Sequence, residues 1–422
     1  MSVVFGSLIS VGLTRIRGGW WAQCGIEGMA GVTLQQIFQQ GYAAFAQGHR
    51  LPDRVRAAAW AIMTCRTAVL GGHVQRCPEG HFERLWYNSC RHRLCPQCSW
   101  LQIERWLAIQ KARLLVCDHD HAIFTMPDDL RGLWLANVKP MTDILFTVVR
   151  QTLFELLADD RYLGARPGLI ATLHTWSQTL VFHPHLHCLV TGGGVTDAGE
   201  WRPVSNGFLL PVRVVMVLFR GKLLAAVDAA VQRGTLTLPD GMPRRHWAIL
   251  RNKLGRTKWN VHIRERYPHG AGVLTYLARY IRGGPIANQR LVSCTQGVVT
   301  FGYRLNGEGA GGAHPRQGRM RVSIAEFIRR YLVHVPAAGT RVVRSYGLYA
   351  PTQGEALAGC REQLGQRPVE KPGVLDWQMA CRDRGDAHPE RCPRCGRLLV
   401  RLGVILPARI PPPAHLPVKV VA

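Results

Sequence analysis

The chain has 422 residues, and its 53 lysines and arginines outweigh 27 acidic residues to give a formal net charge of +26. An apolar fraction of 47% supplies enough buried surface for a folded core, which excludes an intrinsically disordered chain. The length predicts two or three domains. Of the basic residues 46 are arginines, whose planar side chains can each bind two phosphate oxygens. We therefore predict a polyanionic partner, and nucleic acid is favoured because no basic amphipathic helix suited to a membrane surface is found.

Several other classes of protein are excluded. No run of about 18 apolar residues occurs, so no membrane-spanning helix is predicted. The first residues lack a basic region before their apolar run, which argues against a secretory signal. The 13 cysteines are too sparse for a disulfide scaffold, and five of them cluster between Cys65 and Cys98. Such clustering indicates metal binding in a reducing compartment, and we expect a cytoplasmic protein.

The first third of the chain is predicted to be helical around a cysteine-rich segment. Residues 1–32 are interpreted as an extension, and a helical pattern of apolar residues begins at Thr33. A second helix is predicted from Asp53 to Thr64, followed by the cysteine-rich segment 65–98 and a helix over residues 100–115. We expect residues 33–115 to form one domain.

The pattern then changes to a mixture of strands and helices, which we assign to a second domain over residues 116–350. Strands are predicted at 121–127, 168–176, 185–193, 259–263 and 297–304. Helices are predicted at 133–158, 208–233, 273–282 and 324–335. Residues 351–422 are expected to form a tail that contains a CxxC motif.

The cysteine-rich segment predicts a structural zinc site. Its spacing is Cys77-x3-His81-x8-Cys90-x4-Cys95-x2-Cys98, and a C-x2-C turn supplies two of the four ligands that zinc requires. Zinc takes four ligands and the segment offers five candidates, so either one candidate is not a ligand or a second metal ion is bound. The alternative to any metal site is a set of buried free thiols. A zinc site here would present nearby arginines to DNA, namely Arg76, Arg84, Arg91 and Arg93. A second CxxC turn, Cys392-x2-Cys395, lacks clear partners, with His388 or Cys381 as candidates.

A histidine-rich strand predicts a second kind of metal site. His183, His185 and His187 alternate, so they point to one face of a strand unless Pro184 bends the chain. His185 and His187 are predicted to bind one divalent ion, Mg²⁺ or Mn²⁺, that acts on a phosphate. The candidates for a third ligand are His183, Gln178 and His174; the alternative is a set of buried, hydrogen-bonded core histidines.

Two tyrosines, Tyr276 and Tyr280, lie one turn apart in a predicted helix and therefore share a face. Arg279 and Arg282 flank them and would attract phosphate. Taken alone, the pair is better explained as an aromatic stripe that packs on the sheet. A phenol with a pKa of about 10 is a poor nucleophile unless a metal activates its substrate.

These features occur in an order that resembles the HUH-type rolling-circle transposases of bacterial insertion sequences, the IS91 type. The resemblance covers about residues 33–350 and rests on CRTAVLGGHVQRCPEGH, WYNSCRHRLCPQC, HAIFTMP, LHTWSQTLVFHPHLHCLVTGGG, FRGKLL, YLARYIRGGPIANQRL and EFIRRYLVHVPAAGTRVVRSYGLYA. The first zinc turn departs from the family pattern, because Gly80 and then His81 stand where a cysteine is common.

The resemblance implies an α+β chain: an N-terminal helical zinc-binding domain, then an HUH nuclease domain with an antiparallel sheet and a tyrosine-bearing helix. It implies that His185 and His187 form the metal motif and that Tyr276 and Tyr280 are nucleophiles. The expected activity is cleavage and rejoining of single-stranded DNA at element ends through a 5′-phosphotyrosine, by a bacterial, nucleoid-associated protein. Two alternatives are a plasmid replication initiator or relaxase with the same chemistry, and a non-catalytic zinc-dependent DNA-binding protein.

Overall fold

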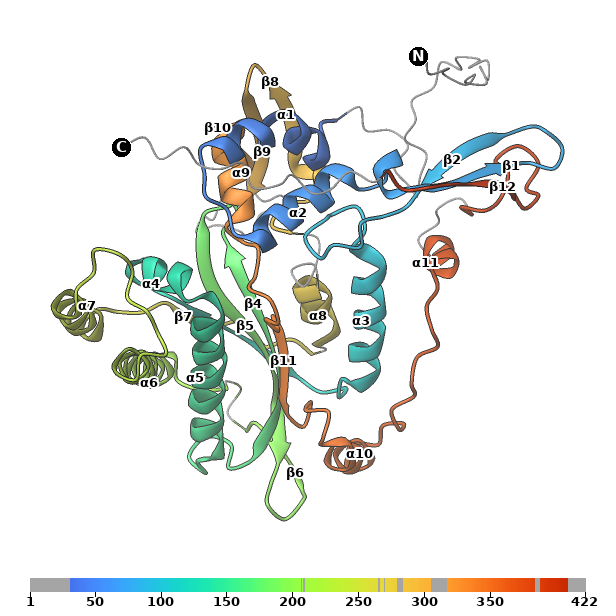
Figure 1. Ribbon diagram of the computed structural model, residues 1–422. Helices are drawn as coiled ribbons and strands as arrows, with labels where there is room; N and C mark the ends of the chain where they lie inside the picture. The colour runs from blue at the N-terminus through green and yellow to red at the C-terminus, as the bar shows by residue number, and fades with distance from the viewer. Residues whose placement is uncertain are drawn as a thin grey trace.

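The computed structural model describes residues 31–408 except for 206, 208, 265, 269, 279–283, 305–316 and 384–387, and it leaves the side chain of Tyr276 undescribed. Within these residues no helix is both long and apolar enough to cross a membrane. The chain combines antiparallel sheets with helices, so the prediction of a mixed α and β fold is confirmed at that level (Figure 1).

A six-stranded antiparallel sheet forms the centre of the molecule, in the order β11-β4-β5-β3-β7 with β6 paired to β5. The long strands β4 and β5 contain the predicted strands at 168–176 and 185–193. Both are buried along most of their length, because core clusters cover both faces of the sheet. The strands are β3 (His119–Thr125), β4 (Arg166–Trp176), β5 (Phe182–Val195), β6 (Trp201–Pro203), β7 (Val261–Ile263) and β11 (Val343–Gly347).

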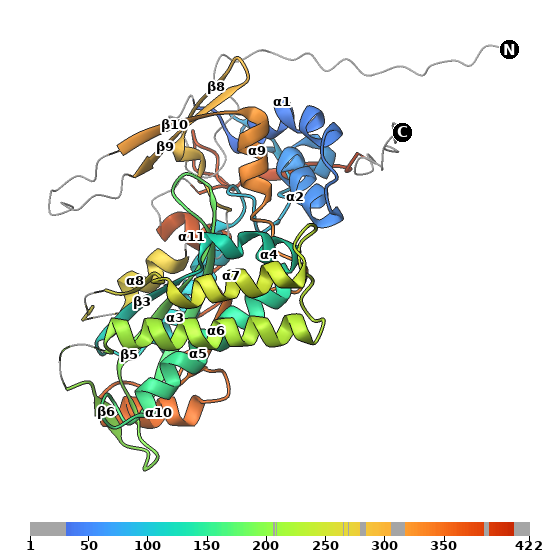
Figure 2. The ribbon, with the colours of Figure 1, turned by 90° about the vertical axis from the view of Figure 1, so that its left-hand side faces the viewer.

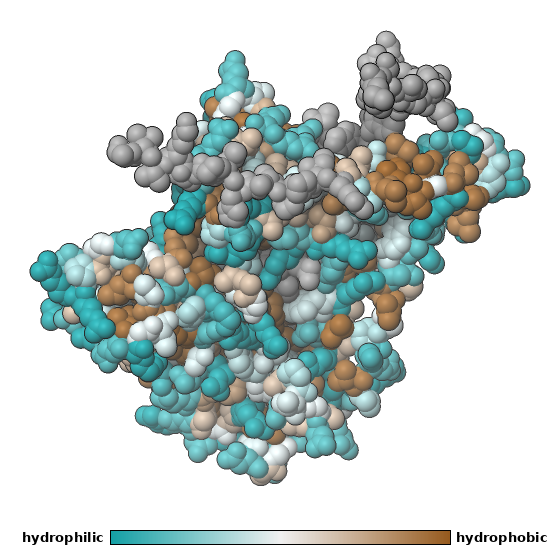
Figure 3. Space-filling view, in the orientation of Figure 1, coloured by the Kyte–Doolittle hydropathy of each residue, from teal (hydrophilic) through white to brown (hydrophobic). Residues whose placement is uncertain are grey.

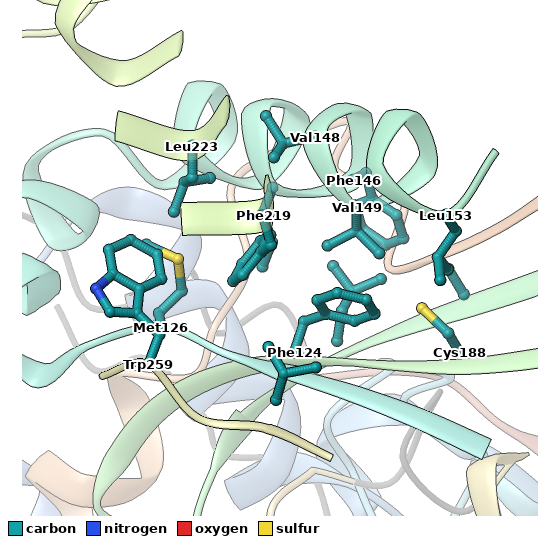
Figure 4. Packing of buried hydrophobic residues seen from close by; sticks show 14 of the residues in the cluster. Phe124, Met126, Phe146, Val148, Val149, Leu153, Cys188, Phe219, Leu223 and Trp259 are labelled. Atoms are coloured by element: carbon teal, nitrogen blue, oxygen red, sulfur yellow. The ribbon is translucent and has the colours of Figure 1, made fainter. Parts of the chain in front are cut away.

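One face of this sheet is covered by long apolar helices. Phe124 of β3 packs against Phe219 at a ring-centroid distance of 5.0 Å, beside Phe146 and Leu186 in one buried cluster (Figure 4). Figure 2 shows the helices of this layer in front of the sheet. They are α4 (Arg131–Ala136), α5 (Val138–Ala158), α6 (Val212–Gln232) and α7 (Arg244–Arg256).

The single helix predicted at 133–158 is interrupted at Asn137, which has a non-helical backbone with φ −136° and ψ 47°. Its side-chain amide donates to the carbonyls of Leu133 and Thr237, at 2.9 and 2.6 Å. An asparagine that bonds to backbone groups competes with the helix, and here it joins the helical layer to the loop after α6.

The opposite face of the sheet is covered by α3 (Trp100–Arg113), α8 (Gly270–Ala278) and α10 (Gly354–Gln363). Leu274 and Leu277 of α8 share a buried cluster with Ile170 of β4 and Leu189 of β5. A side chain at Gly270 would meet the ring of His119 at 2.8 Å, so glycine lets this helix begin directly on the sheet.

A second layer lies above the central sheet and combines distant parts of the chain (Figure 1). Helices α1 (Leu34–Gln47) and α2 (Asp53–Thr64) pack with α9 (Ile324–Leu332) and with the sheet β8 (Leu291–Thr295), β9 (Val298–Arg304) and β10 (Gln317–Ser323). Thr33 caps α1 in a capping box with Gln36, which explains why the helical pattern begins there.

A third, small sheet joins the hairpin that follows α2 to the C-terminal end of the described chain, in the order β12-β1-β2 (Figure 1). Its strands are β1 (Gly72–Arg76), β2 (Glu83–Tyr87) and β12 (Val400–Ile405), and α11 (Trp377–Asp383) lies nearby. Figure 3 shows apolar side chains gathered at this end of the molecule, and Val400, Leu402 and Val404 of β12 are at least half exposed. The hairpin and its pairing with the C-terminal segment were not predicted, because its strands are short and lie inside the cysteine-rich segment.

Candidate active site and metal centres

Three histidines from two neighbouring strands converge on one face of the central sheet. His174 of β4 lies directly opposite His185 of β5, and His187 follows two residues later on the same side. The ligand nitrogens of all three lie within 4.8 Å of one another. The third histidine beside the predicted ligands His185 and His187 is therefore His174, which was one of the three candidates.

His183 and Gln178 lie outside this group of three. His183 precedes His185 by two residues on β5, and the centres of their rings lie 5.5 Å apart. Nδ1 of His183 lies 3.6 Å from Oδ1 of Asp128. Gln178 sits in the turn between β4 and β5, where its backbone carbonyl accepts a hydrogen bond from Arg290. The ring of His183 thus lies next to that of His185, but it does not belong to the group whose ligand nitrogens all lie within 4.8 Å of one another.

Hydrogen bonds orient two of the three rings. Nδ1 of His185 donates to the carbonyl of His183 at 2.7 Å, and Nδ1 of His187 shares a hydrogen bond of 2.8 Å with Nε2 of His121. With Nδ1 occupied in this way, Nε2 is the atom with which each ring would bind an ion. His121 was not predicted to be part of the site. The signal that could have identified it is its position at the start of the strand predicted at 121–127.

The rings are neutral at neutral pH because they are buried. Burial lowers the pKa of His185 to about 4, and it lowers the pKa of His174 and of His187 well below the usual range. A neutral imidazole keeps its lone pair for a metal ion. Three such nitrogens within 4.8 Å fit one divalent cation, and because they carry no charge the cation would keep its full charge for a phosphate.

The helix that carries the first predicted tyrosine lies on the same face of the sheet as the three histidines. Leu189 follows His187 by two residues on β5, and Ile170 precedes His174 by four on β4, so both share the histidines' face. These two residues pack against Leu274 and Leu277 of α8. Tyr276 belongs to α8, but its side chain, like Arg279, Tyr280 and Arg282 as a whole, lies outside the described residues.

Four cysteines form a compact group between α2 and α3. Cys65 ends α2, and its Sγ lies 3.5 Å from Sγ of Cys98, which lies 3.3 Å from Sγ of Cys90. Cys95 completes the group. This is the ligand set of a tetrahedral structural zinc site, and it includes Cys65, which the sequence analysis noted nearby but left out of the predicted set.

The other two predicted zinc ligands lie elsewhere. Cys77 and His81 form a separate group with Cys392 and Cys395 of the C-terminal segment, and all four ligand atoms lie within 4.8 Å of one another. The five predicted ligands are thus divided between two groups. Neither His388 nor Cys381, the partners considered for the second CxxC turn, belongs to this group; His388 instead accepts a hydrogen bond from the backbone of Glu390.

Comparison with known proteins finds two family models that match this chain. The family model described as "Transposase zinc-binding domain" matches residues 37–126, and the model described as "Putative transposase" matches residues 168–356. "Putative transposase y4qJ" of Sinorhizobium fredii (strain NBRC 101917 / NGR234) is 36% identical over 381 residues, which is 87% of this chain and 93% of that protein. The chain belongs to the IS91 family of transposases.

A second relative of the transposase is the "Transposase for insertion sequence element IS801" of Pseudomonas savastanoi pv. phaseolicola. It is 28% identical over 355 residues, which is 82% of each protein. No solved structure matches the transposase. The zinc-binding match contains the group of Cys65, Cys90, Cys95 and Cys98, and the other match contains the three histidines and α8.

The arginines of the zinc-binding region differ in accessibility. Arg91 is exposed and takes a left-handed backbone with φ 54°, whereas Arg93 is half-buried. Arg76 pairs with Glu83 at 2.6 Å, and the Arg84 guanidinium lies 4.3 Å from the ring centre of Trp86. Arg76 and Arg91 are therefore the two exposed arginines of these four, and Arg76 is paired with Glu83.

Proposed function

We propose that this transposase nicks and rejoins single-stranded DNA at the ends of its element through a 5′-phosphotyrosine, during rolling-circle transposition. The observation that supports the proposal is the position of His174, His185 and His187 on the sheet face against which α8 packs. A metal site and a helix bearing a tyrosine on one face are the two parts that such a reaction requires.

The phenolic oxygen of Tyr276 or Tyr280 attacks the phosphorus of the scissile phosphodiester. A tyrosine–phosphorus bond forms as the bond from phosphorus to the 3′ oxygen breaks, the phenol loses its proton, and the departing 3′ oxygen gains one. The products are a 5′-phosphotyrosine and a free 3′ hydroxyl. Because one phosphoester replaces another, a 3′ hydroxyl can reverse the step and rejoin the strand without a nucleotide cofactor.

The residues that would hold Mg²⁺ or Mn²⁺ are His174, His185 and His187. When bound, the ion polarises the phosphate and offsets the charge that develops in the transition state. The role of the protein is to hold three neutral nitrogens in place, with His121 fixing the ring of His187 and the carbonyl of His183 fixing that of His185.

The positive charge of the chain would supply binding that does not depend on sequence. A net charge of +26 favours a polyanion, and neutralising phosphates releases counterions. We assign this role to Arg91 and Arg93 in the zinc-binding region and to Arg279 and Arg282 beside the tyrosines. Two tyrosines would permit a second cleavage before the first junction is resolved.

The proposal predicts a covalent adduct between the protein and DNA. Incubated with single-stranded oligonucleotides from the element ends and with Mn²⁺, the full-length transposase should form a labelled band that survives a denaturing gel. Omitting the divalent ion should remove the band. DNA binding with no adduct under any divalent ion would instead identify a non-catalytic DNA-binding protein.

A substitution at His121 tests the support of the metal site. His121→Ala should raise the Mn²⁺ concentration for half-maximal adduct formation by about 10- to 100-fold, with a smaller effect on the rate at saturating Mn²⁺, because the ring of His187 loses its partner. His262→Ala is the matched control, since His262 lies exposed on the neighbouring strand β7. An unchanged Mn²⁺ dependence for His121→Ala would assign His121 to packing alone.

A further inference from the structure

The group of Cys77, His81, Cys392 and Cys395 is formed by two turns from opposite ends of the chain. Cys77 and Cys395 are 318 positions apart in sequence, yet their sulfurs lie 3.4 Å apart. Sγ of Cys77 also lies 3.9 Å from Nδ1 of His81. The zinc-binding match ends at residue 126, so it does not include the C-terminal pair.

These distances suit one tetrahedral zinc ion. With zinc–sulfur bonds of about 2.3 Å and zinc–nitrogen bonds of about 2.0–2.1 Å, neighbouring ligand atoms of a tetrahedron lie about 3.5–3.8 Å apart. The observed 3.4 and 3.9 Å lie close to this range, and Cys77, Cys392 and Cys395 are all free thiols. Three thiolates and one imidazole are a donor set that zinc accepts in structural sites.

The backbone on both sides has the form of a metal-binding turn. Gly80 and Gly396 have left-handed backbones, with φ of 68° and 71°, and each donates its N–H at 2.9 Å to the carbonyl of the cysteine that begins its turn. The N–H of Arg394 points to the sulfur of Cys392 at 3.4 Å. The two turns thus face each other as two halves of one site.

The surroundings are too small to hold the segments together by apolar packing. The buried cluster here consists of Cys77, Cys392 and Leu399, with Phe82 packed against it. Strand β12 pairs with β1 beside it, so the C-terminal segment has a fixed register on the hairpin. So few buried side chains do not stabilise a folded unit of this size by themselves. In small units of this kind a bound metal ion commonly supplies the missing stabilisation.

We propose that Cys77, His81, Cys392 and Cys395 bind a second structural zinc ion, which fastens the C-terminal segment to the β1–β2 hairpin. The zinc-binding region of this transposase is then a two-metal unit, and its second half is encoded at the far end of the chain. This proposal concerns zinc content and does not rest on DNA cleavage, so either can fail without the other.

Zinc content of the full-length protein tests the proposal, measured by elemental analysis and native mass spectrometry after removal of loosely bound metal. The wild type should hold two zinc ions. The double variant Cys392→Ser/Cys395→Ser should hold one, and Cys65→Ser should also lose one, from the other group. A wild type with one zinc ion, or a Cys392→Ser/Cys395→Ser variant that keeps two, would overturn the proposal.

Variants at a single histidine separate ligand loss from misfolding. His81→Ala should lose one zinc ion, whereas His81→Cys should keep both, because a thiolate can replace the imidazole. His388→Ala is the matched control, since His388 lies in the same C-terminal segment but outside the group, and it should keep both. Loss of zinc from His388→Ala together with retention by His81→Ala would place the ligand at His388 and contradict the assignment.

Discussion

Replacing both Tyr276 and Tyr280 by phenylalanine is expected to reduce covalent adducts with single-stranded DNA by at least about 10⁴-fold, the scale of losing a catalytic nucleophile. The phenol oxygen is the atom that bonds to phosphorus, and phenylalanine lacks it. Binding of the same oligonucleotide, measured by fluorescence anisotropy, should change little, because the arginines and the fold are unchanged.

The single variants assign the two tyrosines. If one residue makes the first attack, its phenylalanine variant alone should lose the adduct on a substrate with a single cleavage site. Tyr303→Phe, in β9 and away from α8, serves as the control. Adducts that persist in the double variant would show that a different side chain is the nucleophile.

His185→Ala is expected to lower adduct formation by about 10²-fold or more and to abolish its stimulation by Mn²⁺. The variant removes one of three nitrogens that lie within 4.8 Å of one another. His183→Ala is the matched control on the same strand, because His183 stands outside the group and faces Asp128. Thermal unfolding of both variants would exclude a general loss of structure.

Equal activity of His185→Ala and the wild type would remove these histidines from the reaction and leave them as buried core residues. A loss in His183→Ala as large as that in His185→Ala would place His183 among the ligands. The assignment of the third ligand to His174 predicts that His174→Ala resembles His185→Ala in its Mn²⁺ response.

The central strands and their histidines were predictable because both depend on local alternation. Period-two spacing places His185 and His187 on one face whatever lies around them. Which residue joins them depends on pairing between β4 and β5, which places His174 directly opposite His185. The interruption of the helix at Asn137 could not be predicted for a similar reason, because it involves a hydrogen bond to Thr237, 100 positions away.

The division of the cysteines into two groups could not be predicted from their spacing in the sequence. Spacing identified turns that can bind metal, but it cannot state which turn meets which. Cys65 joins its group because α2 ends beside the loop of Cys90–Cys98, and Cys77 meets Cys395 because β12 returns to β1. Both outcomes are set by tertiary packing.

The pairing of β12 with β1 has a consequence for biosynthesis. The hairpin ligands leave the ribosome 318 positions before Cys395, which at about 5–20 residues per second is a delay of roughly 15 to 65 s. During that interval the hairpin would have two of the four proposed zinc ligands and no partner strand. A polypeptide terminated before residue 400 would keep the hairpin without its partner strand permanently.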